Sequence, residues 1–384
     1  MAQPSPKPVF APWSEPDAKP LIQFRNVTKR FGDFTAIDDL SLDIYEREFF
    51  ALLGPSGCGK TTMMRMLAGF EAPSEGTILL SGQDIGPVPP NKRAVNMMFQ
   101  SYALFPHLTV WDNIAFGLKR AKMPAKELGD RVEEMLRLTR LTKFAKRKPH
   151  QISGGQRQRV ALARSLAKAP KLLLLDEPLG ALDKKLRQDT QFELMDIQEK
   201  TGTTFVIVTH DQEEAMTVAS RIAVMDEGKL IQVATPDAIY ETPATTYVAD
   251  FIGDVNLIEG TARPEPGAEP GTWRVHVAWA EGQPDIVGTT SREFARGQKV
   301  HLGIRPEKVT ITPDKPEGAI NAVRGRILDI AYLGNISTYH VELPSGHVIK
   351  AQAANTRRIA RRTFTWEDEV WLSWTETAGV LLET

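Results

Sequence analysis

One loop constrains the fold of this chain more than any other feature. Residues 54–61 read GPSGCGKT and satisfy the pattern G-x-x-x-x-G-K-[S/T]. The apolar run Phe49–Leu53 precedes the loop, and the segment Thr61–Ala68 follows it and ends before Gly69. Backbone N–H groups surround a phosphate chain in such a loop when a buried strand leads into it and a helix leaves it. The sequence therefore predicts an α/β fold with a phosphate-binding loop.

The residue types in this loop predict how it holds a nucleotide. Lys60 can reach the β- and γ-phosphate oxygens, and Thr61 can present its hydroxyl to Mg²⁺. Cys58 is the single cysteine, which excludes an internal disulfide. We interpret it as a loop residue beside the phosphates and not as a nucleophile, because no base lies near it in the sequence. The predicted nucleotide-binding residues of this region are Gly54, Pro55, Ser56, Gly57, Cys58, Gly59, Lys60, Thr61 and Thr62.

Two further segments carry groups that suit phosphate chemistry. A buried strand ending at Leu175 leads into Asp176, which suits a metal shell, and Glu177, which can deprotonate a water molecule. Ser153, Gly154, Gly155 and Gln156 form the N-terminus of a predicted helix and thus a second anion-binding device. The alternatives are a solvated strand end and an ordinary helix cap. Because the chain has two cradles and one nucleotide pattern, we expect the second cradle to serve a nucleotide held by another copy.

The texture of the sequence divides the chain into regions. Apolar strands alternate with helices over 21–255, which predicts a parallel sheet covered on both faces. Over 256–384, strict alternation and frequent glycine and proline predict an antiparallel sandwich or small barrel. Residues 1–20 contain six prolines and predict a disordered or polyproline-like tail.

Particular elements are predicted within this plan. A helix at 126–141 should bury Leu128, Val132, Met135 and Leu136, and a helix opened by Asp211 should have Glu214 as the partner of a capping box. Expected strands are Leu21–Arg25, Leu40–Ile44, Phe49–Leu53, Lys171–Leu175 and Thr203–Val208, and a further helix is expected over Gln156–Lys168.

Composition and charge exclude several classes of protein. The 47 basic and 48 acidic residues give a net charge of −1, so there is no general electrostatic case for binding nucleic acid, and none is expected as a partner. The longest apolar run has five residues, far below the roughly 18 needed to cross a bilayer. The first 20 residues show no secretory signal pattern. A membrane role would therefore act through a partner.

Several motifs occur together in the order and spacing of one family. They are Gly54–Thr61, Gln100, Ser153–Gln156, Asp176-Glu177, Ala181-Leu182-Asp183 and His210. In this set the chain resembles the nucleotide-binding subunits of ABC transporters from about Leu21 to Gly253, which implies a RecA-like core with a helical subdomain at about 101–168. The Ser-Gly-Gly-Gln signature separates that family from other P-loop ATPases, and Ile152 stands where leucine is commoner.

The resemblance implies a role for each matching position. Phe31 would stack on adenine, and Gln100 would contact Mg²⁺ and the attacking water. Glu177 would be the catalytic base, His210 the γ-phosphate switch, and Asp183 the acid that couples two sites across a dimer. The implied catalytic residues are Lys60, Glu177, Asp183 and His210, and the implied metal ligands are Thr61, Gln100 and Asp176. Alone, Phe31 also fits a core position and His210 an incidental one.

The resemblance further implies an assembly. Two copies would close head to tail around two ATP molecules under two transmembrane permease subunits, at the cytoplasmic face of a bacterial plasma membrane. A periplasmic or extracellular solute-binding protein would take part indirectly. The run Ser101–His107 would form a groove for a permease helix, although plain core packing is an alternative. Residues 256–384 resemble an OB-like (TOBE-type) regulatory domain.

The resemblance also implies a substrate, which none of the residues above would touch. Residues 96–102, 145–150 and 330–334 look most like the putrescine-importing type. Spermidine, sugar or ferric-iron importers are the alternatives, and a non-transport ABC ATPase is a distant one, since this chain has one cassette and no coiled-coil insertion. A dinucleotide-binding dehydrogenase is excluded because no G-x-G-x-x-G follows the first strand.

Overall fold

The computed structural model describes residues 10–180, 183–356 and 363–383. The chain divides into two compact units, Met1–Pro236 and Asp237–Thr384. This division lies upstream of the predicted boundary between 255 and 256. The helix α8 (Thr246–Ile252) belongs to the second unit because Arg305, in that unit, donates hydrogen bonds to the carbonyls of Ala249 and Gly253, both at 2.8 Å.

A six-stranded sheet forms the centre of the first unit. Its strand order is β10-β9-β3-β8-β7-β6, and all pairs are parallel except β9 with β10. Residues 49–53 and 204–209 are buried throughout, as their continuous apolar character predicts. The prediction of a mainly parallel sheet is therefore confirmed. The strands are β3 (Phe49–Leu53), β6 (Val95–Met98), β7 (Leu172–Asp176), β8 (Thr204–Thr209), β9 (Arg221–Asp226) and β10 (Lys229–Ala234).

A second, antiparallel sheet lies in the same unit. Its order is β2-β1-β4-β5, with β1 (Ile22–Phe31), β2 (Phe34–Ile44), β4 (Glu75–Leu80) and β5 (Gln83–Asp84). The sequence predicted the buried ends of β1 and β2 but not a separate sheet. Phe24 of this sheet and Leu52 of the central sheet share one buried core with Met63.

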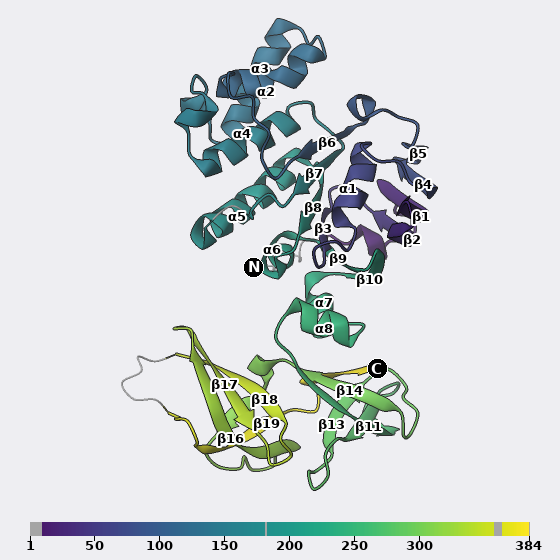
Figure 1. Ribbon diagram of the computed structural model, residues 1–384, viewed down its shortest axis with the longest axis vertical. Helices are drawn as coiled ribbons and strands as arrows, with labels where there is room; N and C mark the ends of the chain where they lie inside the picture. Colours follow the sequence, from purple (N-terminus) through teal and green to yellow (C-terminus); the bar gives the residue numbers. More distant parts are fainter. Residues whose placement is uncertain (1–9, 181–182, 357–362, 384) are drawn as a thin grey trace, which may run out of the picture. The chain divides into compact units, whose positions relative to one another are not determined.

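The described residues of the first unit also contain six α-helices. They are α1 (Lys60–Ala68), α2 (Val110–Arg120), α3 (Ala125–Leu138), α4 (Gly154–Leu166), α5 (Lys184–Thr201) and α6 (Gln212–Val218). In Figure 1, α2, α3 and α4 gather at one end of the unit and form the helical subdomain. The buried face of α3 is the predicted one: Leu128, Val132, Met135 and Leu136. The helix α4 begins earlier than predicted because Ser153 caps it.

The prediction that residues 1–20 are disordered is wrong for the part that the structure describes. A short 3₁₀ turn, η1 (Pro12–Ser14), lies before β1. The Arg221 guanidinium lies 4.9 Å from the centre of the Trp13 ring, and Phe10 and Trp13 form an edge-to-face pair at 6.0 Å. These aromatic contacts anchor the segment despite its prolines. Residues 1–9 lie outside the described part.

The strands described in the second unit form two antiparallel five-stranded sheets, in the orders β13-β12-β11-β14-β20 and β15-β19-β16-β17-β18. Val277 and Leu302 of the first sheet share a core with Ile327 and Leu372 of the second. This confirms the predicted all-β region. Its strands are β11 (Asn256–Pro266), β12 (Trp273–Ala278), β13 (Ile286–Thr290), β14 (Lys299–Ile304), β15 (Thr310–Thr312), β16 (Asn321–Tyr332), β17 (Ile336–Glu342), β18 (Val348–Ala354), β19 (Glu369–Trp374) and β20 (Gly379–Glu383).

The remaining helical elements are short. A helix, α7 (Pro236–Glu241), stands at the division of the two units, and four further 3₁₀ turns are η2 (Pro90–Lys92), η3 (Thr142–Phe144), η4 (Pro149–Gln151) and η5 (Pro306–Lys308). Of all helices in the described ranges, none combines the length and the apolar character needed to cross a membrane.

Candidate nucleotide-binding site

The predicted loop joins β3 to α1 with a backbone that depends on glycine. Gly57 and Gly59 both have left-handed backbone, with φ of 86° and 104°. A Cβ at Gly59 would lie 2.6 Å from the Ala36 carbonyl oxygen and from Ile37 Cδ1. A Cβ at Gly54 would lie 2.4 Å from the Met225 carbonyl oxygen. Conformation and close packing together therefore require these residue types.

Lys60 lies inside this loop. Its Nζ donates to the carbonyls of Gly54 at 2.7 Å and Pro55 at 2.8 Å, and lies 3.6 Å from Cys58 Sγ. Cys58 is buried, which agrees with its interpretation as a loop residue. The ammonium group is thus held at the N-terminus of α1, where the helix dipole adds a further partial positive charge. Thr61 follows it, with an exposed side chain, and Thr62 is half-buried.

Two predicted residues, Gln100 and His210, contact the carboxylate of a third, Glu177. Gln100 Nε2 donates to Glu177 Oε2 at 2.8 Å, and His210 Nδ1 lies 3.1 Å from Glu177 Oε1. The three residues follow β6, β7 and β8, which are neighbours in the sheet, so their loops emerge at the same edge. The loop after β3 emerges there too, because β3 pairs with β8 in parallel. The site is therefore assembled from four strand ends.

Glu177 has an unusual backbone. Its φ is 43°, in the left-handed region, which for a residue other than glycine costs roughly 1–2 kcal/mol. Its N–H donates to the Val208 carbonyl at 3.0 Å, so the neighbouring strand fixes the turn. The strained turn keeps the carboxylate between Gln100 and His210.

Asp176 is the nearer acid to the end of β7. Its own burial and then the adjacent Glu177 carboxylate raise the pKa of Asp176 above its ordinary value, against Arg65 and Lys60, which lower it. A half-buried carboxylate in this state is stabilised by a bound cation. Together with the Thr61 hydroxyl it offers the hard oxygen ligands that Mg²⁺ prefers.

A complete protein cage for a metal is not present in the described part of the chain, which holds no group of three or more His, Cys, Asp or Glu side chains placed for one. Mg²⁺ in phosphoryl-transfer sites needs only one or two protein ligands, because substrate phosphates and water complete its shell. The residues present therefore fit a Mg²⁺ ion that arrives with its nucleotide.

The second cradle has the geometry of a reciprocal helix cap. The backbone N–H of Gln156 donates to Ser153 Oγ at 3.3 Å, and the N–H of Ser153 donates to Gln156 Oε1 at 3.0 Å. Gly154 and Gly155 form the first turn of α4, and a Cβ at Gly155 would lie 3.5 Å from Leu186. Within the described ranges no hydrogen bond or ion pair joins this cradle to the phosphate-binding loop of the same chain. Its service to a second copy stays a prediction.

The remaining predicted positions lie around this centre. Asp183 caps α5 by accepting from the Leu186 N–H at 3.0 Å, whereas Ala181 and Leu182 lie outside the described residues. Phe31 ends β1 with 45% of its surface exposed, and Lys29 Nζ lies 4.6 Å from the centre of its ring. An aromatic ring so exposed is available for stacking, but its contact with adenine stays a prediction.

The capping box predicted at the start of α6 is only half formed. Asp211 accepts from the Glu214 N–H at 3.1 Å. The Glu214 carboxylate accepts instead from the Thr209 hydroxyl, which in turn accepts from the Asp211 N–H at 2.9 Å. Glu214 is buried, and desolvation raises its pKa to about 7. The sequence pattern identified Asp211 and Glu214. It did not predict the hydrogen bonds that fix Thr209 and Asp211, the two residues adjacent to His210.

The run Ser101–His107 forms the loop between β6 and α2. Its apolar side chains are partly buried. Tyr102 and Leu104 are half-buried, and the Phe105 ring lies 4.4 Å from the Phe116 ring. The predicted groove for a partner helix stays a prediction.

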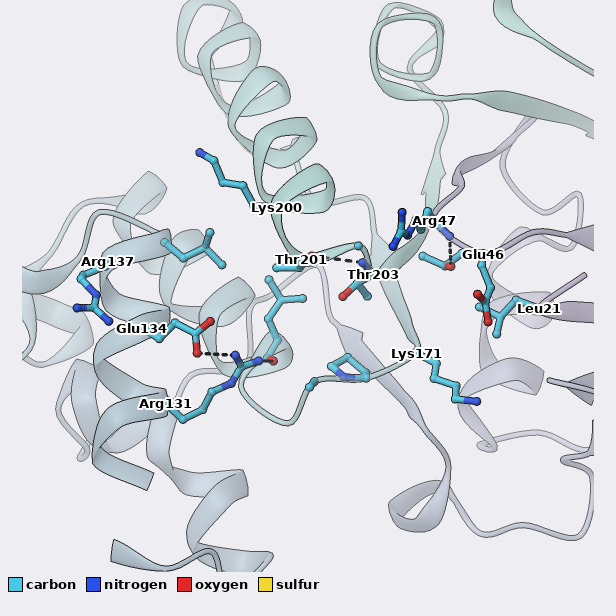
Figure 2. A pocket seen from close by; sticks show the side chains of 16 residues that line it. Leu21, Glu46, Arg47, Arg131, Glu134, Arg137, Lys171, Lys200, Thr201 and Thr203 are labelled. Atoms are coloured by element: carbon cyan, nitrogen blue, oxygen red, sulfur yellow. Dashed lines mark hydrogen bonds and ion pairs between the residues drawn. The ribbon is translucent and has the colours of Figure 1, made fainter. Parts of the chain in front are cut away.

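A groove of about 700 Å³ lies elsewhere on the first unit (Figure 2). It is lined by Lys171 and Thr203, which stand just before β7 and β8, whereas the nucleotide residues follow those strands. Arg131 in this groove donates to the carbonyls of Leu166 and Ala167 at the end of α4. Arg131 thus complements the C-terminus of α4, as basic residues commonly do. The groove is not the nucleotide site, because it lies at the opposite ends of β7 and β8.

Comparison with known proteins agrees with this geometry. The family profile "ABC transporter" matches residues 37–180, and the profile "TOBE domain" matches residues 302–382. The chain is 54% identical over 94% of its length to a putrescine transport ATP-binding protein, PotG, of Escherichia coli (strain K12), of which 95% is covered. It is 50% identical over 88% of its length to a spermidine/putrescine import ATP-binding protein, PotA, of Rubrobacter xylanophilus, of which 88% is covered.

Two solved structures resemble more than half of this chain. The structure of cbiO1 from Clostridium perfringens, part of the ABC transporter complex cbiONQ, has a TM-score of 0.54 at 28% identity and covers 57% of this chain and 90% of that chain. A dimeric post-hydrolysis state of the ATP-binding cassette MJ0796, bound to ADP and Pi, has a TM-score of 0.50 at 33% identity and covers 56% of this chain and 98% of that chain. On its motifs, its site and these relatives, the chain belongs to the family of ATP-binding subunits of ABC transporters.

Proposed function

We propose that this chain is the ATP-hydrolysing subunit of an ABC importer and drives the uptake of a polyamine, with putrescine as the first candidate. The observation that carries the proposal is the convergence of Gln100 and His210 on the Glu177 carboxylate, at the sheet edge that also presents Lys60. A carboxylate held between two polar side chains beside a phosphate-binding loop can activate water for attack on a phosphoryl group.

Each residue then has a chemical task. Lys60 and the N–H groups of the loop hold the phosphate oxygens and stabilise the charge that develops during transfer. Glu177 accepts a proton from the attacking water, while Gln100 and His210 orient its carboxylate. Mg²⁺, held by Thr61, Asp176 and Gln100, would neutralise negative charge on the phosphates.

A second copy would complete the site. Ser153–Gln156 of one protomer would contact the nucleotide held by residues 54–61 of its partner, and Asp183 would couple the two sites. Ser153 is exposed, and in the described residues it makes no bond to the phosphate-binding loop of its own copy, which leaves the start of α4 available to a partner. The solved MJ0796 cassette, described as dimeric, gives further support. Closure of the dimer on ATP and its reopening after hydrolysis would provide the conformational change that drives transport.

This conformational change would act on two transmembrane permease subunits at the cytoplasmic face of the plasma membrane. Residues 101–107 would receive a permease helix, and a solute-binding protein would deliver the substrate from outside. The second unit would stabilise the dimer or regulate it. The relatives named for putrescine and for spermidine/putrescine support a polyamine as substrate.

The catalytic assignment is tested by Glu177→Gln. The amide keeps the size of the side chain but cannot accept the proton of water, so we expect hydrolysis to fall by roughly 10²–10⁴-fold with ATP affinity unchanged. Steady-state phosphate release and a fluorescent-nucleotide titration measure the two quantities. Glu133→Gln, an exposed carboxylate on α3, is the matched control. Full turnover in the Glu177 variant would refute the assignment.

The substrate is tested by transport. The chain is reconstituted with its permease subunits and solute-binding protein in vesicles, and uptake of putrescine is compared with that of spermidine, maltose and ferric iron. ATP-dependent putrescine uptake supports the proposal. Uptake of one of the others alone assigns the chain to that importer class instead.

A further inference from the structure

The loop after Gln100 contains two strained residues in succession. Tyr102 and Ala103 have left-handed backbone, with φ of 61° and 44°. Neither is glycine, so each costs on the order of 1–3 kcal/mol unless its surroundings hold it. The Tyr102 N–H donates to the Phe99 carbonyl at 2.8 Å, which closes a tight turn around Gln100. The position of Gln100 against Glu177 therefore depends on whatever fixes this turn.

Arg164, on α4, fixes it. Its Nη1 donates to the Ala103 carbonyl at 2.8 Å and its Nη2 to the Tyr102 carbonyl at 2.9 Å. Its guanidinium lies 5.5 Å from the centre of the Phe105 ring. The planar fork of a guanidinium holds two adjacent acceptors in a fixed geometry, whereas a lysine ammonium is a point charge on a flexible stem. One side chain thus binds both strained residues and the loop that follows them.

The same helix begins at the second cradle. It runs from Gly154 to Leu166, with Ser153 as its cap, and so forms about 20 Å of continuous helix. Asn96 of β6 makes a second tie to it, by donating to the Ser165 carbonyl at 2.6 Å. The loop after β6 and the cradle at the other end of α4 are therefore joined through one helix.

We propose that Arg164 is a positioning residue that couples the loop at 100–107 to the Ser153–Gln156 cradle and thereby holds Gln100 at Glu177. The part of this inference that concerns coupling rests on the proposed function, in which a permease helix contacts residues 101–107. The part that concerns positioning rests only on the contacts of this chain.

The chain offers a matched control. Arg131, on α3, also donates to two consecutive backbone carbonyls, those of Leu166 and Ala167, and pairs with Glu134 at 2.7 Å. It binds the C-terminal end of α4, close to Arg164, and makes none of the contacts to Tyr102 and Ala103. Arg131→Lys therefore loses a similar fork in the same subdomain without releasing the loop.

The first experiment measures amide hydrogen exchange in the isolated full chain. In Arg164→Lys we expect a peptide covering residues 99–108 to exchange at least about tenfold faster, because the turn loses its clamp. In Arg131→Lys the same peptide should exchange within twofold of the original chain. Arg164→Gln, which keeps an uncharged donor, serves if the lysine variant does not fold. Unchanged exchange in the Arg164 variants, or equal acceleration in Arg131→Lys, overturns the proposal.

The second experiment measures coupling in the assembled transporter. The ratio of ATP hydrolysis with and without substrate-loaded binding protein should fall at least about fivefold in Arg164→Lys and persist in Arg131→Lys. A retained ratio in Arg164→Lys overturns the coupling role. If the original assembly shows no stimulation, the proposed importer function is contradicted, while the exchange experiment still decides the positioning role.

Discussion

The loop at 54–59 and the segments that follow β6 and β7 both use left-handed backbone, yet they achieve it in different ways. In the loop, Gly57 and Gly59 adopt positive φ without steric cost. In the other segments Ala103 and Glu177 adopt it against their own preference, at φ of 44° and 43°. Hydrogen bonds hold both turns: Arg164 donates to the Ala103 carbonyl, and the Glu177 N–H donates to the Val208 carbonyl. The backbone of the loop at 54–59 follows from its own glycines. The positive φ of Ala103 and Glu177 is maintained only by contacts that form in the folded chain.

This difference assigns the two regions different tasks. A loop whose shape is intrinsic presents the same N–H groups whatever its neighbours do, which suits the binding of phosphate. A turn held by distant side chains changes when those side chains move, which suits a catalytic carboxylate and glutamine that must respond to a partner. Substitutions at Gly59, Gly57 and Ala103 test this difference, and Glu214→Gln tests the segment after β8.

The largest effect is expected for Gly59→Ala. Its Cβ would meet the Ala36 carbonyl oxygen and Ile37 Cδ1 at 2.6 Å, in addition to the cost of positive φ. We expect ATP affinity to fall by roughly 10²–10³-fold, about 3–4 kcal/mol. Gly57→Ala has the same conformational cost but open space around it, and should lose roughly 5–30-fold. Equal losses in a fluorescent-nucleotide titration would show that packing plays no part.

The next effect concerns the segment after β8, where Glu214 braces His210. The charged groups that act on Glu214 are Asp211 and His210 beside it and Arg187 on α5; β3 and β8, on which α6 packs, carry no charged side chain. Burial raises its pKa from 4.5 to about 7. The folded chain therefore holds this proton more tightly than the unfolded chain does, and its contribution to stability is complete below pH 4.5 and is lost as pH rises to 7.

Glu214→Gln tests this sign, because the amide keeps a hydrogen-bonding group that never ionises. Relative to the original chain we expect no stability difference near pH 4.5 and a gain of up to about 3 kcal/mol by pH 8. Urea unfolding at several pH values measures it. A difference that does not depend on pH would contradict the assigned burial of a charge.

The smallest effect is expected for Ala103→Gly. Glycine relieves the strain but increases the entropy of the unfolded chain, so stability should change by less than about 1 kcal/mol. Ala125→Gly, in the helical backbone of α3, should instead lose up to about 1 kcal/mol. Thermal unfolding compares the two, and a loss above 2 kcal/mol at residue 103 would mean that its left-handed turn is not strained.

Much of the fold was predictable because its signals are local. The run Phe49–Leu53 is apolar at every position, and the structure buries it as a central strand. Gly69 ends α1 with φ of 86° as predicted. The antiparallel sheet of β1, β2, β4 and β5 was not predicted, since strand pairing depends on partners far apart in the chain. The ordered segment at 10–20 escaped prediction for the same reason: its proline content indicates disorder, and its anchor is Arg221, far along the chain.

By itself, the sequence determined the phosphate-binding loop, the helix cap at Ser153 and the alternation that builds the second unit, because each depends on residues within about one turn or strand of one another. Only the tertiary structure decided that Gln100 and His210 share the Glu177 carboxylate, that Glu214 turns to Thr209, and that Arg164 holds the strained turn. Those contacts join separate strands and helices, so their energy appears only once the sheet has brought the chain segments together.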